Sequence, residues 1–251
     1  MKPHHDHFSA VAEAYASRRP SYPQHLFAYL AELSEQHELA WDCAAGSGQA
    51  TIPLTHFYRR VVATDASAAM LELAPGHPAV EYRVASASAS GIDPASVDLV
   101  AVAQALHWLD LDEFYAEVDR VLAPGGLLAV WTYGNLRLED AGMNSLLDRF
   151  YHEILGPYWS PERRHVESGY RTLAFPYTEF DPPFFSMEQH WTVDQLLGYV
   201  GTWSATQKFR QAQRQDPVKE LARELVPRWG DTRLARCVSW PLSLRVGRKP
   251  L

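Results

Sequence analysis

Residues 40–51 constrain the fold of this chain more than any other segment. A short apolar run ends at Asp42 and passes into a loop of small residues around Gly46 and Gly48, after which residues 49–57 can continue as a helix. In an open parallel sheet, the loop that follows a strand lies at the crevice where ligands bind, and glycine lets the main chain approach a ligand closely. The pattern therefore predicts a nucleotide-type binding site in an α/β fold.

A carboxylate follows this loop at the spacing of a ribose-binding group. The β-branched run 61–64 ends in Asp65, roughly 20 residues past the glycines. The dinucleotide-binding fingerprint needs a third glycine at the position of Thr51, and this chain has none there. It has an acid, Asp42, ahead of the loop instead. These residues therefore favour a ligand that contains a nucleoside but is not a dinucleotide.

The loop resembles the first motif of the class I S-adenosylmethionine-dependent methyltransferases, acid-x-Gly-x-Gly-x-Gly. The resemblance implies a Rossmann-like α/β fold with a seven-stranded, mostly parallel sheet and helices on both faces. Ala44 stands where the family usually has its first glycine. We expect an ordinary negative φ there, so that only a methyl group is added near the methionine part of the cofactor. The resemblance implies that the motif residues bind the cofactor, with Asp65 on its ribose: Asp42, Ala44, Gly46, Ser47 and Gly48.

Length and composition indicate one α/β domain. The chain has 251 residues, 47% of them hydrophobic, which is enough for a full core. It contains no run of 18 apolar residues, and we expect a cytoplasmic protein that binds no membrane. Cys43 and Cys237 have neither a disulfide framework nor metal-ligand spacing, so we expect no metal. A net charge of −7 and the absence of an Asn-Pro-Pro-aromatic motif argue against a nucleic-acid partner.

A second motif lies near the N-terminus. Its pattern, Tyr15-x-x-x-Arg19-Pro20-x-Tyr22-Pro23, resembles a signature of the methyltransferase type 11 subgroup that includes the trans-aconitate methyltransferase-like enzymes. The resemblance implies that helices within 8–35 cover the cofactor as a lid. It also implies that Tyr15 and Arg19 lie near the cofactor carboxylate or the substrate, with Tyr22 on the substrate side. The alternative is that Tyr22 only packs the lid and Arg19 caps a helix end.

Further cofactor contacts are expected after the next two strands. If Asp65 holds the ribose, Ala66 and Met70 would lie beside the adenine, although Met70 can equally be core. After the predicted strand 80–84, Ser86 and Ala87 occupy the next contact positions. Relatives usually carry an acid after this alanine, and here it is absent. Adenine recognition would then depend on serine hydroxyls or main-chain groups.

The predicted strand 97–102 leads into a segment with reactive side chains. Gln104, His107 and Trp108 fit the subgroup pattern Gln-Ala-x-His-Trp, and the turn lies at the same carboxyl edge as the glycine loop. We assign Gln104 to the cofactor, His107 to general-base catalysis and Trp108 to substrate stacking. A structural, hydrogen-bonded histidine is the alternative for His107. Trp131 and Tyr133, on the strand that follows, are further expected substrate contacts.

The chain divides into four regions of one domain. We predict lid helices in 8–35, the cofactor-binding core in 36–135, an inserted substrate cap in 136–183 and C-terminal strands and helices in 184–251. Insertions of this kind usually carry substrate specificity. Four arginines of the cap can grip a carboxylate substrate, with simple solvation as the alternative for each: Arg137, Arg163, Arg164 and Arg171.

The predicted activity is methyl transfer from S-adenosylmethionine to a small-molecule acceptor, leaving S-adenosylhomocysteine. We expect O-methylation, with a carboxylate as acceptor, by a monomer or homodimer. A carboxylate needs no general base, whereas a hydroxyl or an amine would use His107. Two alternatives stay open: a protein that binds S-adenosylmethionine without catalysis, and a nicotinamide-dependent oxidoreductase.

Overall fold

A single mixed sheet organises the computed structural model, which describes residues 20–251. Tyr15 and Arg19 lie outside the described residues. Within the described part of the chain, nine strands share the sheet in the order β3-β2-β1-β4-β5-β9-β6, and β7 and β8 also pair with β9. Two of the nine, β6 (Arg137–Leu138) and β7 (Thr178–Glu179), have only two residues each. The other seven form the expected Rossmann-like sheet, so the predicted fold class is confirmed.

Five parallel strands carry the apolar runs seen in the sequence. They are β1 (Leu39–Cys43), β2 (Arg60–Asp65), β3 (Val80–Val84), β4 (Val97–Ala103) and β5 (Leu122–Tyr133). β1 lies between β2 and β4, so the glycine loop leaves the middle of the sheet. Strand order reverses at this point, which is where ligands bind in open α/β sheets.

The far side of the sheet is antiparallel. β9 (Arg236–Arg248) pairs with β5 along Leu127–Tyr133 and with β8 (Phe185–Trp191) along its first half. β8 lies in the region 184–251, for which C-terminal strands are predicted. Because β9 runs against β5 and β8, the sheet is parallel everywhere except at this one strand.

Helices cover both faces. α2 (Gln24–Leu33) packs on the face that holds Trp131 and Tyr133, and α5 (Leu111–Val121) packs on the face that holds Val130. α3 (Thr51–Leu54) and α4 (Ala68–Leu71) are single turns. The helix expected over residues 49–57 is therefore much shorter, because Pro53 limits it and Thr55 to Phe57 form turns. A 3₁₀ turn, η2 (Leu106–Trp108), carries His107.

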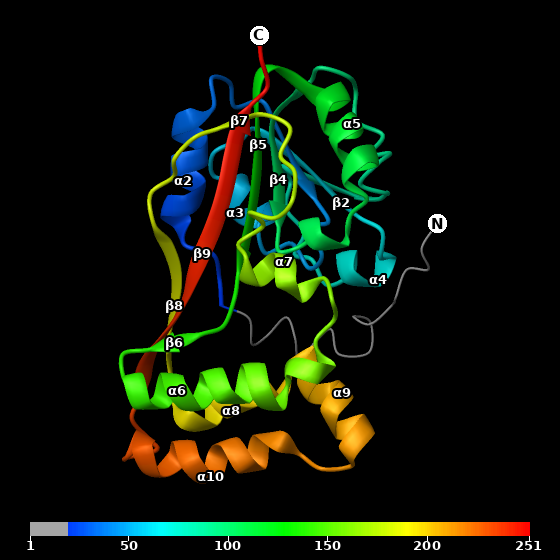
Figure 1. Ribbon diagram of the computed structural model, residues 1–251. Coiled ribbons are helices and arrows are strands. Elements are labelled where there is room, and N and C mark those ends of the chain that lie inside the picture. Colours follow the sequence, from blue (N-terminus) through cyan, green and yellow to red (C-terminus); the bar gives the residue numbers. More distant parts are fainter. Residues whose placement is uncertain (1–19) are drawn as a thin grey trace.

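A second helical layer lies beyond the carboxyl end of β5 (Figure 1). It contains α6 (Ala141–Arg149), α8 (Val193–Gly201), α9 (Ser204–Gln213) and α10 (Pro217–Trp229), and α10 contacts α6 and α8. α6 continues into a π-helical turn, η3 (Phe150–Ile154), then η4 (Gly156–Tyr158) and α7 (Arg163–Glu167). Helices from 136–183 and from 184–251 thus share one layer. The division of the chain into four regions stays a prediction.

No helix among residues 20–251 has both the length and the apolar character that crossing a membrane requires.

Candidate active site

The glycine loop has an alternating main-chain conformation. Ala44, Gly46 and Gly48 have φ values of 57°, 56° and 79°, in the left-handed region, and Ala45 and Ser47 between them do not. Such alternation lines main-chain N–H groups along a concave turn that suits polar or anionic ligand groups. The expectation of an ordinary φ at Ala44 is wrong. The chain must turn sharply out of β1, and the alanine occupies a conformation that glycine adopts at lower cost.

Asp42 is a buried acid with one free oxygen. Its side chain is fully buried at the end of β1, and Oδ2 accepts a hydrogen bond of 2.5 Å from the Thr51 hydroxyl. Oδ1 has no hydrogen-bond partner among the described residues. Burial raises the pKa of Asp42 to about 7, against the Thr51 hydrogen bond, with a smaller contribution from the charge of Asp65. A buried oxygen that lacks a donor fits a ligand that brings a donor and positive charge.

Thr51 explains the missing third glycine. The side chain that breaks the dinucleotide fingerprint is itself fully buried and holds the Asp42 carboxylate. The two departures from the dinucleotide pattern, an acid at 42 and a hydroxyl at 51, are therefore one feature of the site.

Asp65 fastens the loop from the neighbouring strand. Its Oδ2 accepts from the main-chain N–H of Gly46 at 2.9 Å, and its Oδ1 accepts from Ser67 at 2.8 Å. Each oxygen keeps one lone pair, so the carboxylate can still accept from two hydroxyls. Met70 lies beside the loop, with its Cε 3.5 Å from the position that a Gly46 Cβ would take, while Ala66 is exposed.

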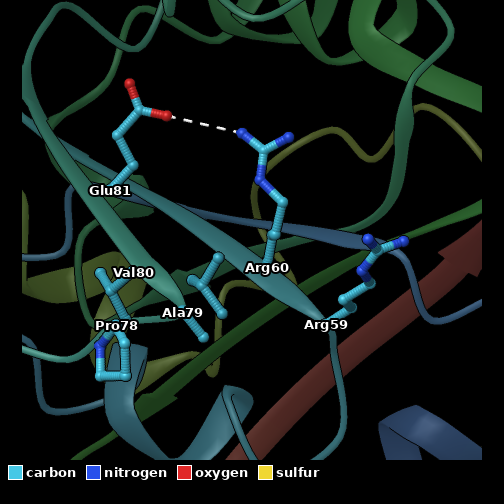
Figure 2. Close-up of a pocket in the computed structure, with 7 residues that line it drawn as sticks. Arg59, Arg60, Pro78, Ala79, Val80 and Glu81 are labelled. Atoms are coloured by element: carbon cyan, nitrogen blue, oxygen red, sulfur yellow. Dashed lines mark ion pairs between the residues drawn. The ribbon is translucent and has the colours of Figure 1, made fainter.

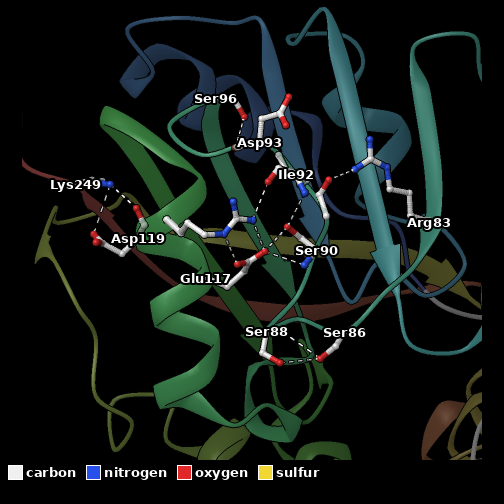
Figure 3. Close-up of polar contacts among 12 residues, drawn as sticks. Arg83, Ser86, Ser88, Ser90, Ile92, Asp93, Ser96, Glu117, Asp119 and Lys249 are labelled. Carbon is white, nitrogen blue, oxygen red and sulfur yellow. Dashed lines mark hydrogen bonds and ion pairs between the residues drawn. The ribbon is translucent and has the colours of Figure 1, made fainter.

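Glu117, an acid of α5, fixes the loop after β3 through hydrogen bonds to Ser90 (Figure 3). Glu117 Oε1 accepts from the main-chain N–H and the hydroxyl of Ser90, and Arg120 donates to both Glu117 oxygens. Ser86 and Ser88 hydrogen-bond to each other at 3.0 Å on the exposed side of the loop, and Ala87 packs inward. The sequence did not single out Glu117, because a lone acid on a predicted surface helix gives no sign of burial.

A hydrogen-bonded chain joins the ends of β4 and β5. The Gln104 side chain accepts from the main-chain N–H of Tyr133 at 3.0 Å and donates to the Tyr133 carbonyl at 3.0 Å. Its oxygen also accepts from the Thr132 hydroxyl. Gln104, with φ 55°, thus ties the two strands together. Its predicted contact with the cofactor is additional to these bonds and stays a prediction.

His107 lies against Tyr170, a residue that the sequence analysis missed. His107 Nδ1 and the Tyr170 hydroxyl are 2.8 Å apart, and Tyr170 is fully buried. Burial lowers the pKa of His107 to about 3, and the charges of Arg163 and His165 act in the same direction. His107 is therefore neutral across the physiological range. No sequence motif contains Tyr170. Its position directly after Gly169 was a local sign of a turn, but it gave no sign of a contact with His107.

The predicted substrate residues divide into two groups. Tyr22, Trp131 and Tyr133 form a buried aromatic cluster, with the Tyr22 ring 5.5 Å from Trp131 and 6.4 Å from Tyr133. Trp108 is 52% exposed beside His107, at 4.7 Å between ring centres. The carbonyl of Pro20 accepts from Gln49 at 3.4 Å, so the segment before Tyr22 runs next to the glycine loop.

A hollow on the opposite edge is separate from these groups. It lies at the amino ends of β2 and β3, where Arg60 pairs with Glu81 at 3.6 Å (Figure 2). Ligands of open α/β sheets bind at the carboxyl edge. The candidate site is therefore the edge that carries Asp42, Asp65, Ser86 and His107.

Comparison with known proteins agrees with this geometry. Residues 41–130 match the family model described as a methyltransferase domain. A Dictyostelium discoideum protein described as a methyltransferase is 30% identical over 97% of this chain and 95% of its own length. An uncharacterised methyltransferase of Mycobacterium tuberculosis is 36% identical over 78% of this chain and 76% of its own. A solved structure from Anaeromyxobacter dehalogenans, described as a type II methyltransferase, is 45% identical, with a TM-score of 0.89 over 93% of this chain and 99% of that one. This chain therefore belongs to the class I S-adenosylmethionine-dependent methyltransferases.

Proposed function

We propose that the chain transfers a methyl group from S-adenosylmethionine to an oxygen of a small carboxylate. The observation that carries the cofactor assignment is the free, buried Oδ1 of Asp42 beside the left-handed loop at 44–48. These residues fit a ligand that carries an amino group and a sulfonium. Asp65, with Ser86 and Ala87, would hold the nucleoside part.

When bound, S-adenosylmethionine supplies a methyl group already activated by a positively charged sulfur. The protein's task is then to align the acceptor oxygen and exclude water, which can contribute roughly 7 to 11 kcal/mol. The buried aromatic cluster of Tyr22, Trp131 and Tyr133 would exclude water from one side of the site. Trp108, whose side chain is half exposed, would contact the acceptor.

Arg163 supports a carboxylate acceptor. Of the four arginines proposed for this role, Arg137 is paired with Asp148 at 2.7 Å, and Arg164 and Arg171 are exposed. Arg163 forms no ion pair with a carboxylate of the described residues, and its charge acts on His107. It lines a hollow with Tyr151 and Trp159, and its guanidinium lies 4.8 Å from the centre of the Trp159 ring.

The low pKa of His107 favours the same acceptor. A base that holds a proton only below about pH 3 is poorly matched to deprotonating a hydroxyl or an amine at neutral pH. A carboxylate is already ionised and needs no base. We therefore place His107 beside the acceptor as a neutral hydrogen-bonding group.

The first experiment is calorimetric titration with S-adenosylmethionine and S-adenosylhomocysteine, with nicotinamide dinucleotide as control. We expect micromolar binding of S-adenosylmethionine and S-adenosylhomocysteine and no binding of the dinucleotide. Asp65→Ala should lose the binding of both S-adenosyl compounds. Failure of the wild-type chain to bind S-adenosylmethionine would overturn the proposal.

The second experiment tests the acceptor with a screen of small carboxylic acids. We expect Arg163→Gln to raise KM at least tenfold for the acids that react, because an ionic contact is lost. Arg223→Gln, an exposed arginine of α10 that does not line this hollow, is the control and should leave KM unchanged. His107→Gln should lower turnover without weakening cofactor binding. Binding of cofactor with no turnover of any acceptor would favour the alternative of a non-catalytic binding protein.

A further inference from the structure

Arg163 is the first residue of α7, a helix that lies between the sheet and the second helical layer (Figure 1). α7 contacts β5 and also η2, the turn that carries His107. Together with the turns η3 and η4, α7 lines a hollow of about 310 Å³. This volume is at the small end of the range for ligand pockets. A ligand of few atoms can therefore bind there, next to the candidate active site.

Tyr151 connects the three segments around this hollow. It is buried in the π-helical turn η3, and such turns are rare and frequent at functional sites. Its main-chain carbonyl accepts a hydrogen bond from Trp159 Nε1 at 3.1 Å. Its hydroxyl oxygen accepts from Arg163 Nε at 2.6 Å. One residue of η3 thus contacts both the end of η4 and the start of α7.

Two aromatic rings also hold the Arg163 guanidinium. Its Cζ lies 4.8 Å from the centre of the Trp159 ring and 5.5 Å from the centre of the Tyr151 ring. Both distances are within the range of cation–π attraction. The two rings contact each other, with 4.8 Å between their centres. The rings and the hydrogen bond to Tyr151 together restrict the position of the guanidinium.

The Nη1 and Nη2 groups are the donors of Arg163 that remain for a ligand. A guanidinium has one N–H on Nε and two on each Nη, and the Nε–H is bound to Tyr151. Within residues 20–251, the structure shows no hydrogen bond or ion pair from Nη1 or Nη2. A carboxylate therefore cannot bind side-on, across Nε and one Nη. It can bind end-on, with one oxygen on each Nη.

The charges around the hollow favour an anion. Arg164 and Glu167 line it together with Arg163, and both are exposed. Two arginines and one glutamate give a net charge of +1, with His152 neutral. Glu167 forms no ion pair with Arg163 in the described part of the chain, so the charge of Arg163 is not neutralised by a direct partner.

We propose that Tyr151 is a positioning residue for Arg163, and that the fixed guanidinium binds both oxygens of one acceptor carboxylate end-on through Nη1 and Nη2. This inference rests on the proposed function and specifies how the acceptor is bound. End-on binding uses one lone pair of each carboxylate oxygen. Each oxygen therefore keeps a second lone pair for the reaction.

The contact with Tyr151 can be measured without cofactor or acceptor. In protein with ¹⁵N-labelled arginine, the Nε–H signal of Arg163 is identified by its loss in Arg163→Lys. We expect Tyr151→Phe to accelerate the exchange of this proton with water about tenfold, the effect of losing one charge-assisted hydrogen bond. Tyr158→Phe is the matched control, because the Tyr158 hydroxyl in η4 accepts from Gln213 instead. An unchanged exchange rate in folded Tyr151→Phe protein would contradict the positioning role.

Kinetics with the reactive acids of the screen test the contact with the ligand. Tyr151→Phe should raise KM about tenfold and leave kcat nearly unchanged, because it disturbs the guanidinium that binds the acceptor. In an Arg163→Gln background the same substitution should have no further effect, since the two residues act as one unit. Arg163→Lys should bind the acid as weakly as Arg163→Gln, because an ammonium group cannot hold two oxygens end-on. Full rescue by lysine, or additive effects in the double variant, would contradict end-on binding.

The outcomes distinguish this inference from the proposed function. Turnover of an acid with a KM that Tyr151→Phe does not change would overturn the positioning role and leave the proposed function intact. Absence of turnover for every acid would overturn the proposed function, and end-on binding of an acceptor with it. In that case, slow exchange of the Arg163 Nε–H that depends on Tyr151 would still establish the contact between the two residues.

Discussion

Two buried carboxylates, Asp42 near the end of β1 and Glu117 within α5, have opposite environments. Glu117 is 7% exposed, and its oxygens accept four hydrogen bonds, from Arg120 and Ser90. The pKa of Glu117 is lowered to about 2, mainly by the hydrogen bonds from Arg120. Asp42 is fully buried with one donor, and burial raises its pKa to about 7.

The difference separates structure from function. The protein itself supplies all the hydrogen-bond donors of the Glu117 carboxylate, and these bonds fix the loop at Ser90. It leaves Asp42 incomplete, so that a buried charge there costs free energy unless a ligand supplies a donor. An acid whose partners are all present stabilises the fold, whereas a buried acid that lacks them is a candidate for ligand binding.

The largest effect we expect is on cofactor binding in Asp42→Asn. Replacing the carboxylate removes the charge that would face the cofactor's amino group, and we expect at least a hundredfold weaker binding of S-adenosylmethionine by calorimetry, about 3 kcal/mol. The variant should fold at least as stably at pH 8, since it no longer buries a charge. Asp98→Asn, at the amino end of β4, is the control and should bind normally.

The pH dependence of cofactor binding tests whether the ionised form of Asp42 binds the cofactor. Because the pKa of Asp42 is about 7, this acid is mostly protonated below pH 7 and ionised above it. Cofactor affinity should therefore fall about tenfold per pH unit below 7 and level off above it. Calorimetry from pH 5.5 to 8.5 measures this slope, which Asp42→Asn should flatten. A slope that persists in the variant would point to another group.

Glu117→Gln should affect stability and leave binding unchanged. A lowered carboxyl pKa contributes stability above its unfolded value of 4.5, and this contribution is lost as pH falls toward 2. We expect a loss of about 1 to 3 kcal/mol in the free energy of unfolding at pH 7, from urea denaturation. The difference from wild type should shrink at pH 3. Glu113→Gln, exposed on the same helix, is the matched control.

The smallest effect concerns the strained alanine of the loop. Glycine adopts the left-handed conformation of residue 44 at less cost, so Ala44→Gly should stabilise the fold by about 0.5 to 1 kcal/mol. Urea denaturation measures this change. Ala116→Gly, at an exposed position of α5 with a negative φ, serves as control and should not stabilise the fold. Destabilisation by Ala44→Gly would show that the alanine methyl group packs usefully.

Sequence alone determined the strand, loop and helix units and their order. Asp42, Gly46, Gly48 and Asp65 are local features of single strand ends, and the parallel topology brings strand ends to one edge. Motif spacing was therefore sufficient to predict the fold and the edge of the sheet at which these residues lie.

Tertiary structure decided the partners of these residues. Hydrogen bonds join residues up to 63 positions apart in the chain: Thr51 with Asp42, Ser90 with Glu117, and Tyr170 with His107. The sign of each pKa shift depends on those partners and on burial, because desolvation and hydrogen bonds act in opposite directions on a carboxylate. The left-handed φ of Ala44 likewise follows from where the chain must go after β1, which a single residue type does not reveal. The sequence thus predicted a candidate site, and packing determined the burial and the hydrogen-bond partners of its acids and bases.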